Sequence, residues 1–149
     1  MKRFRTREQL IADATIAINS HLSIGSKYAL LDNICWVWSE FDGKLEGCRW
    51  WSKEARDLKN SPKELTHEHA VPRKVIINHL LRITNATESV VGDVLQRWCV
   101  AVVITKAQDK HLNGAGLRQR MPVDWDGVDA WARYQAIAMV PVDCSSPAA

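Results

Sequence analysis

Apolar side chains recur at helical spacing along the first part of the chain. Between residues 8 and 20 they share one face of a helix, and Thr6 stands where its N-cap belongs. A wider apolar stripe covers residues 28–41, and Ser52 caps a shorter helical segment that follows a glycine-containing loop. The pattern therefore predicts a helical N-terminal region over residues 1–60.

The middle of the chain alternates between extended and helical patterns. A strand is expected over 64–69, because Pro72 then ends the ladder, and a β-branched run predicts a second, fully buried strand over 98–104. Two helical patterns fill the interval 73–97. Directly after the second strand, a capping-box sequence starts a helix over 105–113.

These elements predict an α+β fold that is predominantly helical. By length the chain is one domain, residues 1–149. The expected parts after the N-terminal region are a core over 62–122 with the helical insertion 73–97, a C-terminal helix within 123–140, and a tail over 141–149.

Composition places the chain among ordinary globular proteins, since 46% of its 149 residues are apolar and 25% are charged. No stretch approaches the roughly 20 apolar residues of a membrane span. The four cysteines form no C-x-x-C pair, and no secretory segment follows the basic start. We therefore expect reduced thiols and a cytoplasmic protein.

The net charge of +3 is compatible with a polyanionic partner but does not identify one. Seven tryptophans are many for this length, and most are expected in the core. The run Arg49-Trp50-Trp51 has two interpretations, a stacking platform beside a phosphate contact or a plug between helices. The second interpretation is favoured.

The densest chemistry lies at His67-Glu68-His69. In a strand, His67 and His69 point to one face and Glu68 to the other, but the alternation loosens where the strand ends. Glu68 and His69 could then converge on one ion or one phosphate. A base beside a metal-binding carboxylate is the minimum needed to activate water.

The sequence Glu-His-Ala-Val-Pro at residues 68–72 resembles the Asp/Glu-His-x-x-Pro signature of HNH endonucleases. These enzymes belong to the His-Me finger superfamily, which is built on a ββα-metal unit. Residues 103–112, Val-Ile-Thr-Lys-Ala-Gln-Asp-Lys-His-Leu, resemble the segment that leads from the second strand into the helix. The resemblance implies His69 as general base, Glu68 as metal ligand and Asp109 as the helical ligand, with His111 beside it.

The implied activity is endonucleolytic hydrolysis of phosphodiester bonds with a divalent cation. Mg²⁺ or Mn²⁺ suits a site rich in carboxylate oxygen, while an added imidazole would also admit Zn²⁺ or Ni²⁺. The implied partner is nucleic acid, DNA in the first instance, and a protein partner stays open. Four basic residues would hold the flanking phosphates: Arg73, Lys74, Arg118 and Arg120.

Two alternatives remain open at this point. His67 and His69 could join His111 or Cys99 in a structural zinc site. The chain could instead be a non-catalytic partner-binding module, such as an inhibitor or adaptor, with tryptophans as interface anchors. The spacing of His67-Glu68-His69 excludes an HExxH zinc protease.

Overall fold

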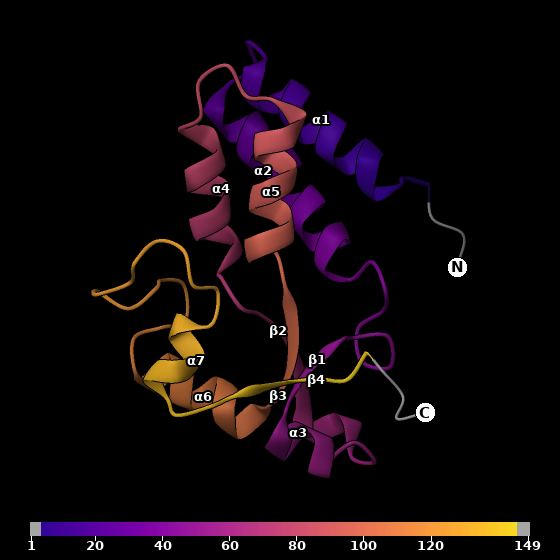
Figure 1. Cartoon of the computed structure of the whole chain (residues 1–149), viewed down its shortest axis with the longest axis vertical. Coiled ribbons are helices and arrows are strands. Elements are labelled where there is room, and N and C mark those ends of the chain that lie inside the picture. The colour runs from indigo at the N-terminus through magenta and orange to yellow at the C-terminus, as the bar shows by residue number, and fades with distance from the viewer. Residues whose placement is uncertain (1–3, 146–149) are drawn as a thin grey trace.

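The computed structural model describes residues 4–145 and confirms a predominantly helical α+β fold (Figure 1). Its helices are α1 (Arg7–Asn19), α2 (Ile24–Ser39), α3 (Lys53–Asp57), α4 (Arg73–Leu81), α5 (Glu88–Trp98), α6 (Lys106–Gly114) and α7 (Ala132–Ala136). Its strands are β1 (Trp50–Ser52), β2 (Leu65–His69), β3 (Ala101–Thr105) and β4 (Pro141–Asp143).

Side-chain caps set where three of the helices begin, as the sequence predicts. Thr6 Oγ1 accepts a hydrogen bond from the Gln9 backbone at 3.1 Å, and Gln9 Oε1 accepts one from the Thr6 backbone N–H at 2.9 Å. Ser52 caps α3, and Thr105 forms the same reciprocal box with Gln108 at the start of α6. The α2 helix starts earlier than predicted, because Ser23 caps it through the Ser26 backbone.

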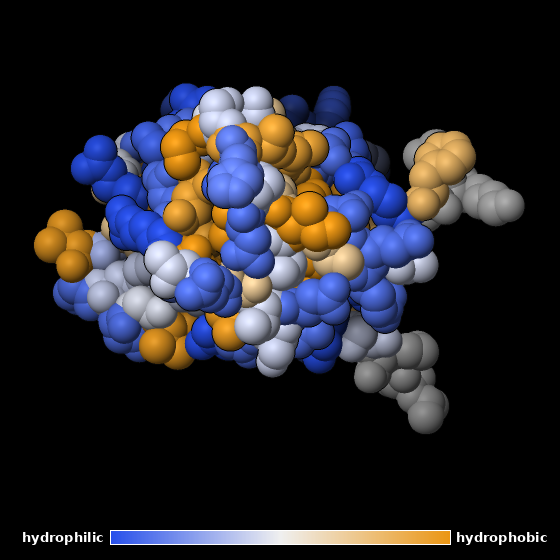
Figure 2. Space-filling view, turned by 90° about the horizontal axis from the view of Figure 1, so that it is seen from above, coloured by the Kyte–Doolittle hydropathy of each residue, from blue (hydrophilic) through white to orange (hydrophobic). Residues whose placement is uncertain are grey.

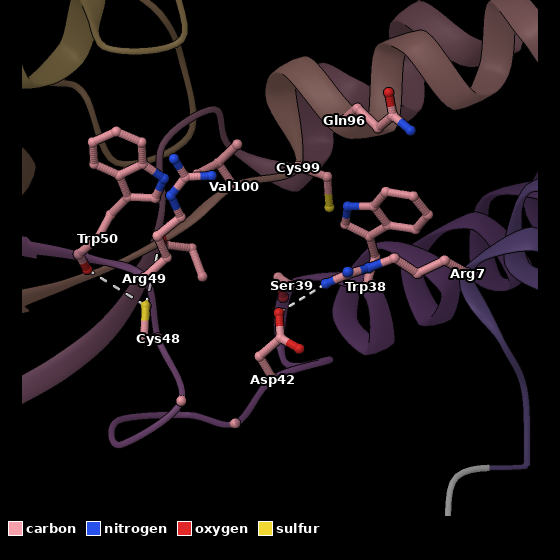
Figure 3. Close-up of a pocket in the computed structure, with 13 residues that line it drawn as sticks. Arg7, Trp38, Ser39, Asp42, Cys48, Arg49, Trp50, Gln96, Cys99 and Val100 are labelled. Carbon is pink, nitrogen blue, oxygen red and sulfur yellow. Dashed lines mark hydrogen bonds and ion pairs between the residues drawn. The ribbon is translucent and has the colours of Figure 1, made fainter. Parts of the chain in front are cut away.

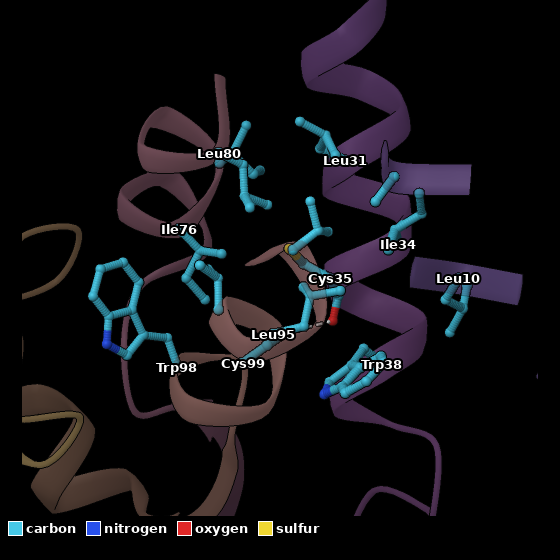
Figure 4. Packing of buried hydrophobic residues seen from close by; sticks show 14 of the residues in the cluster. Leu10, Leu31, Ile34, Cys35, Trp38, Ile76, Leu80, Leu95, Trp98 and Cys99 are labelled. Carbon is cyan, nitrogen blue, oxygen red and sulfur yellow. Dashed lines mark hydrogen bonds between the residues drawn. The ribbon is translucent and has the colours of Figure 1, made fainter. Parts of the chain in front are cut away.

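The helices α1, α2, α4 and α5 lie together and enclose the larger apolar core (Figures 1 and 4). The segment that the sequence marks as an insertion is α4 and α5, and it supplies core residues such as Ile76, Leu80 and Leu95. These pack against Leu31 and Ile34 of α2. The insertion is therefore part of the helical core.

The second half of the molecule is a four-stranded sheet in the order β2-β3-β1-β4. β3 pairs antiparallel with β2 and parallel with β1, and β4 closes the other edge antiparallel to β1. Val102 and Ile104 of β3 face α6 and α7, whereas Val103 faces α3. Both faces of β3 are thus covered, as its β-branched sequence predicts.

The C-terminal prediction is largely wrong. Only α7 is helical within 123–140, because Asp126 accepts hydrogen bonds from the Val128 and Asp129 backbones and closes a turn instead of capping a helix. The expected tail contains β4, which pairs antiparallel with β1, and Asp143 of β4 forms an ion pair at 2.8 Å with Arg49, the residue before β1. Residues 1–3 and 146–149, at the ends of the predicted N-terminal region and tail, lie outside the described residues.

The thiols match the sequence interpretation, since all four cysteines are free.

At the end of the helical half that faces away from the sheet, apolar side chains show between charged ones (Figure 2). Among the exposed apolar residues of the helical half are four on α1, on α2 and in their connection: Ile16, Leu22, Ile24 and Leu30. None of the helices formed by residues 4–145 is long and apolar enough to cross a bilayer.

Candidate functional site

The antiparallel pairing of β2 with β3 determines where α6 runs. Thr105, which ends β3, lies opposite Leu65 at the start of β2. The chain then turns into α6, which packs on both strands and runs back toward the end of β2. Strand, strand and helix therefore bring Asp109 of α6 to the strand end that carries Glu68 and His69.

A polar pocket of about 330 Å³ lies at this strand end. Six residues that the sequence singles out contribute to its lining: Glu68, His69, Arg73, Lys74, Asp109 and Arg118. Acidic, basic and imidazole groups from segments more than thirty residues apart thus meet in one cavity. A pocket of this kind, with convergent polar groups, is where a polyanion could be held and hydrolysed.

Two predicted site residues lie elsewhere. His111 is exposed and is not part of the pocket lining, and the same holds for Arg120. The reason for His111 is helical phase: two residues after Asp109 the helix has turned by about 200°. Asn113, four residues after Asp109, returns to the same face and lines the pocket.

The Glu68 carboxylate is held by two buried residues of the C-terminal segment. Arg133, with a side chain only 1% exposed, donates from Nη1 to Glu68 Oε2 at 3.1 Å. The Tyr134 hydroxyl donates to the same oxygen at 3.0 Å. Arg133 also donates to the backbone oxygens of His69 at 2.7 Å and Leu117 at 2.8 Å. It therefore fixes the end of β2 against the loop that follows α6.

Glu68 lies in an environment that opposes its negative charge. Burial raises the pKa of Glu68, Arg133 and Tyr134 lower it, and the nearby charge of Asp109 raises it again. The net direction is upward despite the ion pair. Repulsion between the two carboxylates is the kind of strain that a cation bound between them would relieve.

The His69 ring is oriented by α2. Its Nε2 lies 2.8 Å from Ser39 Oγ, and the single hydroxyl proton of Ser39 is donated to the Trp36 backbone oxygen at 2.9 Å. We assign the ring proton of His69 to Nε2, since Ser39 Oγ then accepts from it while donating to Trp36. In this neutral form the lone pair is on Nδ1, and Nδ1 is the nitrogen that can take a proton.

The pKa of His69 is lowered to about 3, chiefly by burial and further by the positive charges of Arg73 and Arg133 and by His67. The ring is therefore neutral at neutral pH. Phosphate groups entering the pocket would offset the positive charges of Arg73 and Arg133. Such a ligand would raise the pKa of His69 only through these smaller contributions, because burial, the main cause of the low pKa, would remain.

The same pKa makes stability depend on pH. His69 binds a proton near pH 6.5 in the unfolded chain but only near pH 3 in the folded one. Burial of the neutral His69 ring therefore costs no stability above about pH 6.5, and the free energy of unfolding decreases as the pH falls from 6.5 toward 3. Urea unfolding at about pH 7 and about pH 5 should show a loss of about 2 kcal/mol from this group.

His69→Gln serves as the matched control for this prediction, since it keeps a polar side chain but does not titrate. The pH dependence of its unfolding free energy should be smaller than that of the wild type by about the same 2 kcal/mol. Equal pH dependence in both proteins would contradict the assignment of a low pKa to His69.

The donor set of the pocket suits a hard cation that keeps part of its water. Glu68 and Asp109 offer carboxylate oxygens and Asn113 an amide oxygen, which is the ligand chemistry of Mg²⁺. A carboxylate has about four lone-pair positions, so the contacts of Glu68 with Arg133 and Tyr134 leave positions free. Within residues 4–145, no cluster of three His, Cys, Asp or Glu side chains is arranged around a common metal position. The pocket therefore offers a cation two carboxylates and one amide oxygen, and water and phosphate oxygens would complete its coordination.

The residues of the alternative zinc site do not come together in the described part of the chain. The rings of His67 and His69 are 5.9 Å apart, but His111 is exposed on α6. The buried Cys99 thiol donates to the Cys35 backbone oxygen at 3.2 Å. Cys99 therefore behaves as a small core residue.

A second pocket, of about 360 Å³, is lined by Ser39 among others and includes none of the residues implied by the resemblance to HNH endonucleases (Figure 3). Arg49 and Trp50 stand on one side of it, and Arg7 and Trp38 on the other. Trp50 is half-buried in β1, with its ring centre 5.0 Å from that of Trp131 and the Arg49 guanidinium 5.1 Å from the ring, so it does not plug a space between helices.

Several residues of the site give no signal in the sequence. Arg133 and Tyr134 lie in the segment predicted as the C-terminal helix, where nothing marks them as site residues, and Ser39 and Asp32 lie in α2. Asn113 is the exception, because its spacing of four from Asp109 places both on one helical face.

Comparisons of the chain with protein-family models, with curated proteins and with solved structures find no match.

Proposed function

We propose that the protein is a metal-dependent endonuclease of the HNH type, which hydrolyses phosphodiester bonds in the pocket at the end of β2. One observation carries the proposal. A general-base candidate, three carboxylates and three basic side chains line one pocket. Glu68 and His69 stand on β2 and Asp109 stands on α6, and β3 connects the two in the order that the signature at Glu68–Pro72 implies.

The roles follow from the contacts. His69 Nδ1 takes a proton from a water molecule, whose oxygen forms a bond to phosphorus as the bond to the 3′ oxygen breaks. Arg73, Lys74 and Arg118 hold phosphate oxygens, contacts that position a strand without reading its sequence. Glu68, Asp109 and Asn113 would hold Mg²⁺ or Mn²⁺, which supplies positive charge beside the leaving oxygen when bound.

Positioning is assigned to residues that do not touch the substrate. Ser39 keeps the ring of His69 in the tautomer with a free Nδ1, and Arg133 keeps Glu68 directed at the pocket. Tyr134 stays protonated and donating, because burial raises its pKa well above the usual value. These contacts leave the reacting groups little freedom, which favours catalysis.

The test is conversion of supercoiled plasmid to nicked circle with Mg²⁺ or Mn²⁺, with a chelator as blank. The wild type should nick, and Asp109→Asn should lower the rate at least ~10-fold, as loss of groups at metal sites commonly does. His111→Ala is the matched control on the same helix and should nick at the wild-type rate.

Two outcomes would count against the proposal. A wild-type protein that nicks neither plasmid nor single strands with any of these metals would favour the non-catalytic module. Equal activity of Asp109→Asn and wild type would remove α6 from the metal site.

A further inference from the structure

Trp36 differs from the other six tryptophans of the chain. Its relative exposure is 40%, while the others are buried or half-buried. The indole nitrogens of Trp51, Trp98 and Trp125 donate to backbone oxygens, as expected of residues that fill the core. Trp36 therefore offers a large aromatic surface to solvent, for which core packing gives no reason.

Two cations lie over the Trp36 ring. The Arg73 guanidinium is 4.7 Å from the ring centre and the Lys44 ammonium is 5.6 Å from it. Lys44 is mobile in principle, since its side chain is 65% exposed and its ion pair with Glu40 is long, at 3.6 Å. We call Trp36, Arg73 and Lys44 the Trp36 platform.

The platform adjoins the candidate active site. Trp36 and His69 have ring centres 6.4 Å apart, and Arg73 belongs to both the platform and the pocket lining. The Trp36 backbone oxygen also accepts the Ser39 proton that sets the tautomer of His69. A nucleic-acid strand with a phosphate at His69 would therefore have a neighbouring nucleotide within reach of the platform.

An aromatic face next to cations selects single strands over duplex. Bases in a duplex are stacked on each other and show only their edges, whereas an unpaired base has a free face that stacks on tryptophan or on a guanidinium. The long exposed Lys44 side chain can yield its place over the ring to a base and move to a phosphate.

We infer that the Trp36 platform stacks an unpaired base, so that the substrate class of the site is single-stranded or locally unpaired nucleic acid. The inference rests on the proposed function for the chemistry, but binding to the platform is separable from cleavage. The ligand is defined by its base faces and phosphates, and DNA and RNA strands share both.

The experiment measures binding by fluorescence anisotropy in the presence of chelator, so that no cleavage occurs. The probes are labelled oligo(dT), oligo(U) and a duplex of equal length. The wild type should bind at least one of the single strands more tightly than the duplex. Trp36→Leu should weaken that binding roughly 5- to 150-fold, because stacking one base contributes about 1–3 kcal/mol and 1.4 kcal/mol is tenfold.

Two variants show whether the effect belongs to the ring. Trp36→Phe keeps an aromatic face and should recover part of the affinity. Leu30→Ala removes an apolar side chain that is 46% exposed on the same helix and should bind as the wild type does. Thermal unfolding of each variant confirms that it is folded.

The outcomes separate the inference from the proposed function. Equal binding of duplex and single strands, or wild-type affinity in Trp36→Leu, would overturn the platform even if the protein nicks DNA. Trp36-dependent binding without nicking in Mg²⁺ or Mn²⁺ would uphold the platform and refute the nuclease. A preference for oligo(U) or oligo(dT) identifies the natural strand as RNA or DNA and supports the platform in either case.

Discussion

Replacement of His69 by alanine is expected to lower the rate of phosphodiester cleavage by roughly 10²- to 10⁴-fold, the usual contribution of a positioned general base. The imidazole lines the pocket, is neutral, and in the assigned tautomer donates from Nε2 to Ser39, which leaves the lone pair on Nδ1. Alanine leaves the pocket cations in place. The loss should therefore appear in kcat, while binding of a single strand in the presence of chelator changes little.

His67 provides the control for this prediction. It is a second imidazole on the same face of β2, two residues earlier, and is not part of the pocket lining. His67→Ala removes the same kind of ring from the same strand, so any general damage to β2 should be similar. Nicking by His67→Ala should stay within a few-fold of wild type, whereas equal nicking by His69→Ala and wild type would exclude His69 as the base.

Replacement of Arg133 by methionine is expected to cost about 3–5 kcal/mol of unfolding free energy, the usual result of removing one partner of a buried ion pair. Methionine keeps much of the volume of the side chain but none of its donors. Glu68 would stay buried without its cation, and the carbonyls of His69 and Leu117 would lose their donor. Urea unfolding at neutral pH measures the loss.

Part of this loss should be recoverable. Glu68→Gln in the Arg133→Met background removes the uncompensated charge, so the double variant should unfold at higher urea than Arg133→Met alone. Arg118→Met is the matched surface control, since Arg118 is exposed at the pocket, and it should change stability by no more than about 0.5 kcal/mol. A loss in Arg133→Met as small as in Arg118→Met would contradict the positioning role.

Patterns that depend on neighbours in the sequence were predicted well. The N-cap predicted at Thr6 and the capping box predicted at Thr105 place the starts of α1 and α6, because such a cap forms between residues three positions apart and needs no distant part of the chain. The predicted strand 98–104 begins too early for a related reason. Trp98 continues the apolar face of α5 and belongs to that helix, although a β-branched run follows it.

Predictions that needed a partner far along the chain failed more often. β1 and β4 are three residues each and are strands only because they pair with β3 and with each other. Trp36 lies within the apolar stripe predicted over residues 28–41, but it is exposed and does not belong to the core of the helical half. His111 could have been excluded by helical phase alone, and Asn113 could have been chosen in its place.

By itself, the sequence determined the class of the fold, most helix starts, the central strand, and the pair Glu68-His69 at a strand end, because periodicity and capping act over a few residues. Only the tertiary structure decided which groups share the pocket. Arg133 reaches Glu68 across 65 positions of the chain, and Ser39 reaches His69 across 30. Contacts at such separations depend on how the helices and the sheet pack, and no local pattern of residues contains that information.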